Sequence, residues 1–184
     1  MPVTGHVTLL TVTHFFILTC HRTRMNFSHL IEINDPGNPL IEPLTRTQLW
    51  QGLCLRAERP TVYLAHLDRC EITARFAGGL ERSLHYGEVV VRDSVHLMPP
   101  DEMRILVPEQ GEIKASTLRI KIEEPEPERF FLRFSYSDAQ TEAENQANAM
   151  FDEFRRSAYL EADIDMVREM RRLAADGLLD APIV

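Results

Sequence analysis

The sequence predicts an α+β fold in which a curved antiparallel sheet of seven strands wraps around one long C-terminal helix. Three observations support this prediction. Residues 147–176 contain no Gly or Pro and repeat apolar or small residues at helical spacing. Six strand-like runs come before this segment, and a first strand with a helical region comes before them. The turns between the runs are short, which favours antiparallel neighbours over β-α-β units.

Residues 1–24 differ in composition from the rest of the chain. They contain no Asp or Glu, three of the seven His, and the apolar cluster 15–18. This cluster is far too short to span a bilayer, and the segment lacks the basic start and small-residue cleavage site of a secretory signal. We expect Met25 to be the natural start and residues 1–24 to be a disordered or mis-assigned leader. The alternative is an added edge strand over residues 7–12, which are rich in Thr and Val.

The first strand and two short helices follow this leader. Alternation of Phe27, His29, Ile31 and Ile33 with mainly polar residues predicts a strand that ends at the turn 34–39. The run Thr-Arg-Thr-Gln at 45–48 fits a capping box, which opens a helix that ends before residue 60. Residues 61–67 are predicted as a second short helix or turn, because Pro60 suits a first helical position.

The six later strands are predicted at about 67–76, 80–86, 88–97, 102–108, 113–124 and 129–136. Gly or Pro residues mark the turns between them, at 78–79, 87, 99–101, 108–111 and 123–128. In the last strand Phe130, Leu132, Phe134 and Tyr136 share one face, so that face of the sheet is apolar and needs a cover.

The C-terminal helix supplies this cover through a continuous stripe of apolar and small residues. The stripe comprises Phe151, Phe154, Ala158, Tyr159, Ala162, Met166, Met170 and Leu173. A strand, two short helices, six antiparallel strands and a long final helix form the order of a helix-grip domain. We assign this domain to residues 25–177 and a C-terminal tail to residues 178–184.

Composition excludes several classes of function. The 184 residues suit a single domain with a substantial core. Asp plus Glu number 28 against 20 Lys plus Arg, and the resulting charge of −8 argues against nucleic-acid binding. Three widely spaced cysteines without a C-x-x-C pair fit a reducing compartment, so we expect a cytoplasmic protein. Motifs for metals and nucleotides are absent from the sequence, so we expect no metal and no cofactor.

Four stretches of the sequence resemble a known family. They are Leu-Thr-Arg-Thr-Gln-Leu-Trp at 44–50, Arg-Cys-Glu-Ile at 69–72, the turn at 122–125 with Phe-Leu-Arg-Phe at 131–134, and Ser-Ala-Tyr-Leu-Glu-Ala-Asp at 157–163. The order of elements resembles the START and birch-pollen-allergen superfamily (SRPBCC). The stretches are similar to a bacterial and fungal AtaL-like subfamily of unknown function, over about residues 25–176. The resemblance implies a cavity for apolar or amphipathic molecules between the sheet and the final helix, and it implies no catalytic residue.

Two polar residues interrupt otherwise apolar strand faces. Asp93 lies in phase with Val91 and Val95, where an unpaired carboxylate would be costly. It is a polar ligand anchor or a general base with a raised pKa; alternatively, a bulge turns it outward or Arg82 pairs with it. His29 is either a ligand contact or a hydrogen-bonded core histidine.

We predict six ligand-binding residues from these patterns. They are His29, Tyr86, Asp93, Phe134, Phe154 and Met166. Cys54 and Cys70 are interpreted as small buried hydrophobic residues rather than nucleophiles.

Three hypotheses for the function follow from this set of residues. The leading one is binding of a small hydrophobic or amphipathic ligand between the sheet and the final helix. The second is an enzyme of the aromatase, cyclase or hydrolase kind that uses Asp93 with His29 or Tyr86. The third is a protein-interaction domain with a filled core. We expect no nucleic-acid partner and no integral membrane segment, and the sequence leaves the oligomeric state open.

Overall fold

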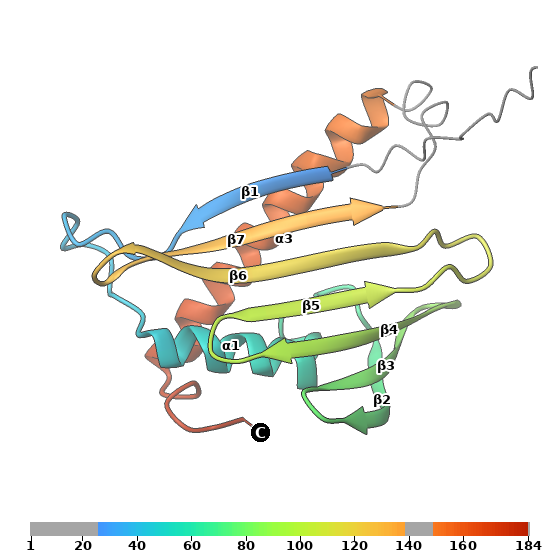
Figure 1. Cartoon of the computed structure of the whole chain (residues 1–184), viewed down its shortest axis with the longest axis horizontal. Coiled ribbons are helices and arrows are strands. Elements are labelled where there is room, and N and C mark those ends of the chain that lie inside the picture. Colours follow the sequence, from blue (N-terminus) through green and yellow to red (C-terminus); the bar gives the residue numbers. More distant parts are fainter. Residues whose placement is uncertain (1–25, 139–148, 184) are drawn as a thin grey trace, which may run out of the picture.

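The computed structural model describes residues 26–138 and 149–183. The expected leader, the first two residues of the expected final helix and the side chain of Phe151 lie outside this description. The elements, in chain order, are β1 (Asn26–Glu32), α1 (Arg46–Glu58), the 3-10 helix η1 (Pro60–Val62), β2 (Arg69–Phe76), β3 (Gly79–Tyr86), β4 (Val89–Met98), β5 (Glu102–Val107), β6 (Ser116–Glu126), β7 (Arg129–Asp138) and α3 (Ala149–Ala175) (Figure 1).

The strands form one antiparallel sheet in the order β1-β7-β6-β5-β4-β3-β2. Strands β2 to β7 follow one another as a meander, while β1 returns to pair with β7, the last strand. Helix α3 crosses one face of this sheet, and α1 lies against the C-terminal half of α3 (Figure 1). The predicted α+β helix-grip fold with seven antiparallel strands is confirmed.

The core lies where the alternating apolar side chains of the strands meet α1 and α3. Phe134 and Leu132 of β7 are fully buried, as are Met166 and Met170 of α3. The other fully buried large side chains are Ile33, Leu49, Leu53, Leu80, Met103, Ile120, Ile122 and Leu179. The alternation of apolar and polar side chains along each strand therefore makes one face of the sheet apolar, and α3 covers that face.

Helix α1 begins with the expected capping box. The Gln48 backbone N–H donates to Thr45 Oγ1 at 3.1 Å, and the Thr45 N–H donates to Gln48 Oε1 at 2.9 Å. In the middle of α1, Gly52 faces Met170 so closely that an added Cβ would lie 2.6 Å from Met170 Cε. A side chain at position 52 would therefore require the buried Met170 side chain to move.

Helix α3 ends in a Schellman motif at Gly177, whose φ is 72°. The Leu178 N–H donates to Leu173 O and the Gly177 N–H donates to Ala174 O, both at 2.9 Å. The residues beyond pack back on α1, because Leu179 is fully buried and Gln48 donates to Asp180 Oδ1 at 2.9 Å.

The expected burial of the whole apolar stripe on α3 is wrong in its first half. The Phe154 side chain is 69% exposed, and Ala158 and Ala162 are exposed as well, whereas Met166, Met170 and Leu173 are buried. The physical reason is length: 27 residues at about 1.5 Å each make a helix of roughly 40 Å. The N-terminal end of α3 reaches past the β1 edge of the sheet (Figure 1).

Candidate functional site

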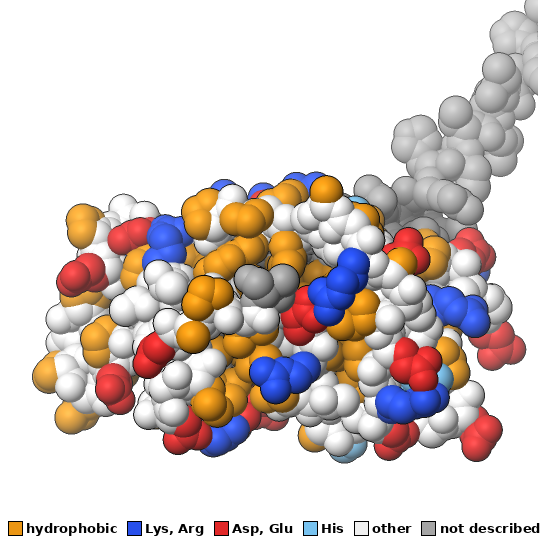
Figure 2. Space-filling view, turned by 90° about the horizontal axis from the view of Figure 1, so that it is seen from below, with side chains coloured by type: hydrophobic (Ala, Val, Ile, Leu, Met, Phe, Trp, Pro, Cys, Tyr) orange, Lys and Arg blue, Asp and Glu red, His pale blue; other side chains and the backbone are white. Residues whose placement is uncertain are grey.

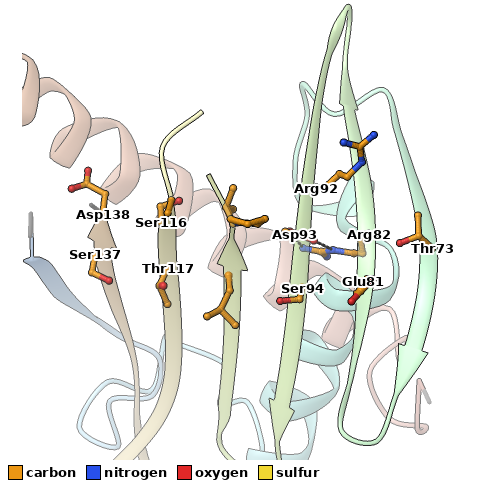
Figure 3. A pocket seen from close by; sticks show the side chains of 14 residues that line it. Thr73, Glu81, Arg82, Arg92, Asp93, Ser94, Ser116, Thr117, Ser137 and Asp138 are labelled. Carbon is orange, nitrogen blue, oxygen red and sulfur yellow. Dashed lines mark hydrogen bonds and ion pairs between the residues drawn. The ribbon is translucent and has the colours of Figure 1, made fainter. Parts of the chain in front are cut away.

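The sheet opens between β4 and β5. Within the described residues, β4 pairs with β5 only from Ser94 to Met98, while it pairs with β3 along its length down to Val89. The first half of β4 therefore follows β3 away from β5 and β6. Figure 3 shows the resulting gap, with Arg92, Asp93 and Ser94 on one side and the start of β6 on the other.

Two hollows meet at this gap. The inner one is a cavity of about 380 Å³ that lies between the sheet, α1 and α3. The outer one, of about 540 Å³, is lined in part by side chains of the opposite sheet face, such as Glu81 and Ser94 (Figure 3). We take the inner cavity as the candidate site because several of its charged side chains, among them Arg82, Asp93 and Asp163, are buried next to apolar walls. Those walls include Pro60, Leu64, Leu84, Val91, Ile105, Val107, Leu118, Tyr136, Tyr159 and Ala162.

Arg82 and Asp93 form a buried ion pair at the cavity wall. Arg82 Nε donates to Asp93 Oδ1 at 2.9 Å and Nη2 donates to Oδ2 at 2.6 Å, and both side chains are almost completely buried. Arg82 Nη1 donates to the backbone carbonyls of Arg56 and Ala57 at 3.0 and 2.9 Å. These carbonyls belong to the last turn of α1, where backbone C=O groups have no hydrogen-bond donor within the helix. The pairing of Asp93 with Arg82, one of the alternatives drawn from the sequence, is confirmed.

A second polar cluster joins α3 to the sheet. The Tyr136 hydroxyl donates to Asp163 Oδ2 at 2.7 Å, and the Tyr136 ring stacks on Tyr159 at a centroid distance of 4.2 Å. His29 Nε2 lies 3.1 Å from the same carboxylate oxygen, although no hydrogen bond joins them. Asp163 itself is 1% exposed. Three elements, β1, β7 and α3, thus bring their polar groups together beside the cavity.

Burial controls the protonation of this cluster. Loss of water raises the pKa of Asp163 to about 7, although the hydrogen bond from Tyr136 and the charge of Arg56 oppose part of this rise. Burial lowers the pKa of His29, so its imidazole is neutral near pH 7. Asp163 therefore exchanges its proton near neutral pH, which is the property that a general acid or base requires.

The six predicted ligand-binding residues divide into three groups. Tyr86 and Asp93 line the cavity. His29, Phe134 and Met166 lie in the core behind it, with the His29 ring stacked on Phe134 at 5.3 Å. Phe154 is exposed on α3 and is not among the cavity-lining residues.

Asp163 and Arg56 are cavity residues that the sequence reasoning missed. The signal for Asp163 was present, because it lies three residues before Met166 and four after Tyr159, within the apolar stripe of α3. Arg56 gave no such signal, since basic residues are common in the last turn of a helix. It lies in the last turn of α1, is 9% exposed and lines the cavity.

Thiol and metal chemistry have little basis in the described residues. Cys54 is buried, and burial together with the charge of Glu58 raises its thiol pKa to about 11, which disfavours a reactive thiolate. Over residues 26–138 and 149–183, no three His, Cys, Asp or Glu side chains are placed to hold a metal ion. None of the helices in this part of the chain has the length and hydrophobicity to cross a membrane.

Solved structures share this fold at low sequence identity. The di-domain aromatase/cyclase StfQ of the steffimycin biosynthetic pathway matches with a TM-score of 0.64 and 10% identity, over 86% of this chain and 53% of that one. The chain therefore spans about half the length of StfQ. The Zhui aromatase/cyclase of Streptomyces sp. R1128 matches with a TM-score of 0.59 and 14% identity, over 83% of this chain and 96% of that one.

A plant enzyme has the same fold. Norcoclaurine synthase of Thalictrum flavum matches with a TM-score of 0.59 and 12% identity, over 94% of this chain and 99% of that one. A comparison with curated proteins finds no match. The sequence profile of the family described as acetylaranotin biosynthesis cluster protein L, or AtaL, matches residues 31–177. The resemblance seen in the sequence is thereby confirmed, and the chain belongs to the AtaL family.

Proposed function

We propose that this protein binds a small hydrophobic or amphipathic molecule in the cavity between the sheet and α3. The observation that carries the proposal is the cavity of about 380 Å³, in which apolar walls are combined with buried charged side chains such as Arg82, Asp93 and Asp163. This volume falls in the range of about 300–1,000 Å³ that is usual for small-molecule sites. Hydrophobic side chains also gather at the centre of the molecular face in Figure 2, with single acidic and basic side chains among them.

The cavity argues against the alternative of a filled core. A protein-interaction domain without a ligand has no use for a void, and closely packed cores contain few voids larger than a water molecule. Charged groups at the wall add to this argument, because a solid core of this size is stabilised more by apolar side chains than by ion pairs.

Binding of a neutral fluorescent probe, N-phenyl-1-naphthylamine, tests the proposal. We expect micromolar affinity for the native protein, since an apolar ring system removes its surface from water in the cavity. Ala162→Trp places a large ring at the cavity wall and should weaken binding, whereas Ala158→Trp, at an exposed site on the same helix outside the cavity lining, should not. Probe binding that occurs only under partly denaturing conditions would refute a native ligand site.

Catalysis is a second candidate function, favoured by one observation. Asp163, with a pKa of about 7, is buried and is held by Tyr136 at the wall of the cavity. We propose that an enzyme of the aromatase, cyclase or hydrolase kind would use Asp163 as its general base or acid, while Tyr136 positions the carboxyl group. The catalytic group that the sequence suggested, which was built on Asp93, is less suitable as a general base. Its carboxylate is already bound by Arg82.

Proton exchange in a model ketone tests this second function. We expect the wild type to accelerate deuterium incorporation into 1-tetralone in D2O, which reports proton removal next to a carbonyl. Asp163→Asn should abolish the acceleration, and Asp165→Asn, at an exposed site two residues along α3, should leave it unchanged. Equal exchange rates with and without the protein would leave ligand binding as the only supported function.

A further inference from the structure

We propose that the ligand carries a negatively charged oxygen group, such as a carboxylate, and that Arg56 binds this group inside the cavity. The inference rests on the proposed ligand-binding function and defines the chemical class of the ligand. Arg56 is 9% exposed and lines the cavity from the last turn of α1. Its side chain makes no hydrogen bond or ion pair with any residue that the structure describes, and its Nε atom is buried without a partner.

An unpartnered guanidinium inside a protein is costly. Arginine does not lose its proton at any pH that proteins experience, so it cannot avoid the penalty by becoming neutral. Buried charges are therefore normally paired with an opposite charge. A buried guanidinium without an ion pair at the cavity wall therefore points to a ligand that brings a negative charge to Arg56.

The carboxylates around the cavity already have partners. Asp93 is bound by Arg82, and Asp138 accepts a hydrogen bond of 2.8 Å from Arg155. Asp163 accepts from the Tyr136 hydroxyl. Each of the other two arginines at the wall thus has an acidic side chain within hydrogen-bond distance. Among the described residues none forms an ion pair with Arg56, although its charge acts on Asp163, whose carboxyl group is held by Tyr136.

The protein holds Arg56 in place from behind. Arg82 Nη1 donates to the carbonyl oxygen of Arg56 itself and to that of the next residue. This contact fixes the end of α1 against β3 and thereby holds the backbone from which the Arg56 side chain extends into the cavity lining. The Arg82–Asp93 ion pair therefore acts as a support for Arg56 as well as a link between strands.

The overall charge of the protein cannot make it select anionic ligands over neutral ones. The chain has a net charge of −8, so its overall field repels anions. Only a short-range contact in the low-dielectric cavity, such as a guanidinium with a carboxylate, can make an anionic ligand bind more tightly than a neutral one of the same shape.

A matched pair of ligands tests the inference on the full chain. 2-Naphthoate and 2-naphthamide have nearly the same shape and differ in charge, and calorimetric titration gives the affinity of each. We expect the wild type to prefer naphthoate by about tenfold or more, as a charged hydrogen bond in a buried site implies. Arg56→Met should remove this preference by weakening naphthoate binding more than naphthamide binding. Arg56→Lys should restore part of it, and Arg59→Met, at an exposed neighbouring position, should keep it in full.

Thermal unfolding of the same variants gives an independent reading. Without ligand, Arg56→Met should melt a few degrees higher than the wild type, because it replaces an unpaired buried charge by an apolar side chain of similar length. Saturating naphthoate should stabilise the wild type more than Arg56→Met. A lower melting temperature for unliganded Arg56→Met would show that Arg56 has a structural role instead.

The outcomes separate this inference from the proposed function. Equal affinity for naphthoate and naphthamide, or a preference that persists in Arg56→Met, would overturn the anion site while ligand binding stands. Binding of N-phenyl-1-naphthylamine without binding of either 2-naphthoate or 2-naphthamide would also overturn the anion site while ligand binding stands. If none of the three compounds binds to the native protein, the ligand-binding function itself fails.

Discussion

The Tyr136 hydroxyl donates a hydrogen bond of 2.7 Å to the Asp163 carboxylate, and this contact ties β7 to α3 at the edge of the cavity. The carboxyl group is nearly inaccessible to water, so the phenol is the principal donor available to its charged form. Burial raises the pKa of Asp163 and the hydrogen bond from Tyr136 opposes part of the rise, so the two residues can be tested separately.

Asp163→Asn should change how stability depends on pH. Raising a carboxyl pKa from 3.8 to about 7 corresponds to roughly 4 kcal/mol, since each pKa unit is worth about 1.4 kcal/mol. Because the pKa is raised in the folded state, the stabilisation is fully present below about pH 4 and is lost as the pH rises through about 7. Urea unfolding between pH 4 and 8 should therefore show that the wild type weakens relative to Asp163→Asn as the pH rises.

His29 changes the pH dependence of stability in the opposite direction. Burial lowers its pKa in the folded state, so its contribution to the free energy of unfolding rises with pH. The difference between wild type and Asp163→Asn largely cancels this contribution, as both proteins contain His29. A difference that does not vary with pH would contradict the raised pKa of Asp163.

Tyr136→Phe should destabilise the protein by about 1–3 kcal/mol at pH 8, where Asp163 is ionised and loses its donor. The loss should be smaller at pH 5, because a protonated carboxyl group needs the donor less. Tyr86→Phe is the matched control, since Tyr86 lines the same cavity and its hydroxyl makes no hydrogen bond to a described residue. Chemical denaturation at the two pH values measures both effects, and equal losses at pH 5 and 8 would argue against this assignment.

Asp93→Leu should cost about 3–5 kcal/mol in the free energy of unfolding, because it leaves the Arg82 guanidinium buried without its carboxylate. The double variant Arg82→Met/Asp93→Leu should recover part of this loss. Full recovery is not expected, since Arg82 also donates to two carbonyls of α1. Probe affinity per folded molecule is measured alongside, and a change in Asp93→Leu would assign Asp93 a direct ligand contact.

Phe154→Ala should change the unfolding free energy by less than about 1 kcal/mol, because most of that ring is already in water. Met170→Ala should cost about 2–5 kcal/mol, since Met170 is fully buried against α1. Urea denaturation of both variants tests the division of α3 into an exposed first half and a buried second half. Similar losses for the two variants would mean that the helix is covered along its whole length.

Gly52→Ala should destabilise the protein, although alanine normally strengthens a helix by about 1 kcal/mol over glycine. The added methyl group would overlap Met170, and overpacking of this kind costs about 1–3 kcal/mol. Combining Gly52→Ala with Met170→Ala should make the two losses less than additive, because the second change removes the obstacle. Thermal unfolding of the two single variants and the double variant measures the coupling.

The order and type of the elements follow from local patterns in the sequence. Alternation in β7, the capping box of Thr45 and Gln48, and the helix end at Gly177 each depend on residues within a few positions of one another. The fold could therefore be predicted from these patterns, and the structure confirms it. The pairing of Asp93 with Arg82 was also within reach, because the two lie on neighbouring strands of one hairpin.

Tertiary structure alone decided which polar groups share the cavity. Asp163 meets Tyr136 and His29 only because α3 crosses the sheet where β1 pairs with β7. Arg56 has no ion-pair partner among the described residues, whereas the fold pairs Asp93 with Arg82 and Asp138 with Arg155. Burial, protonation and pairing depend on every atom that surrounds a group, including those brought from distant segments, whereas helices, strands and turns depend mostly on sequence neighbours.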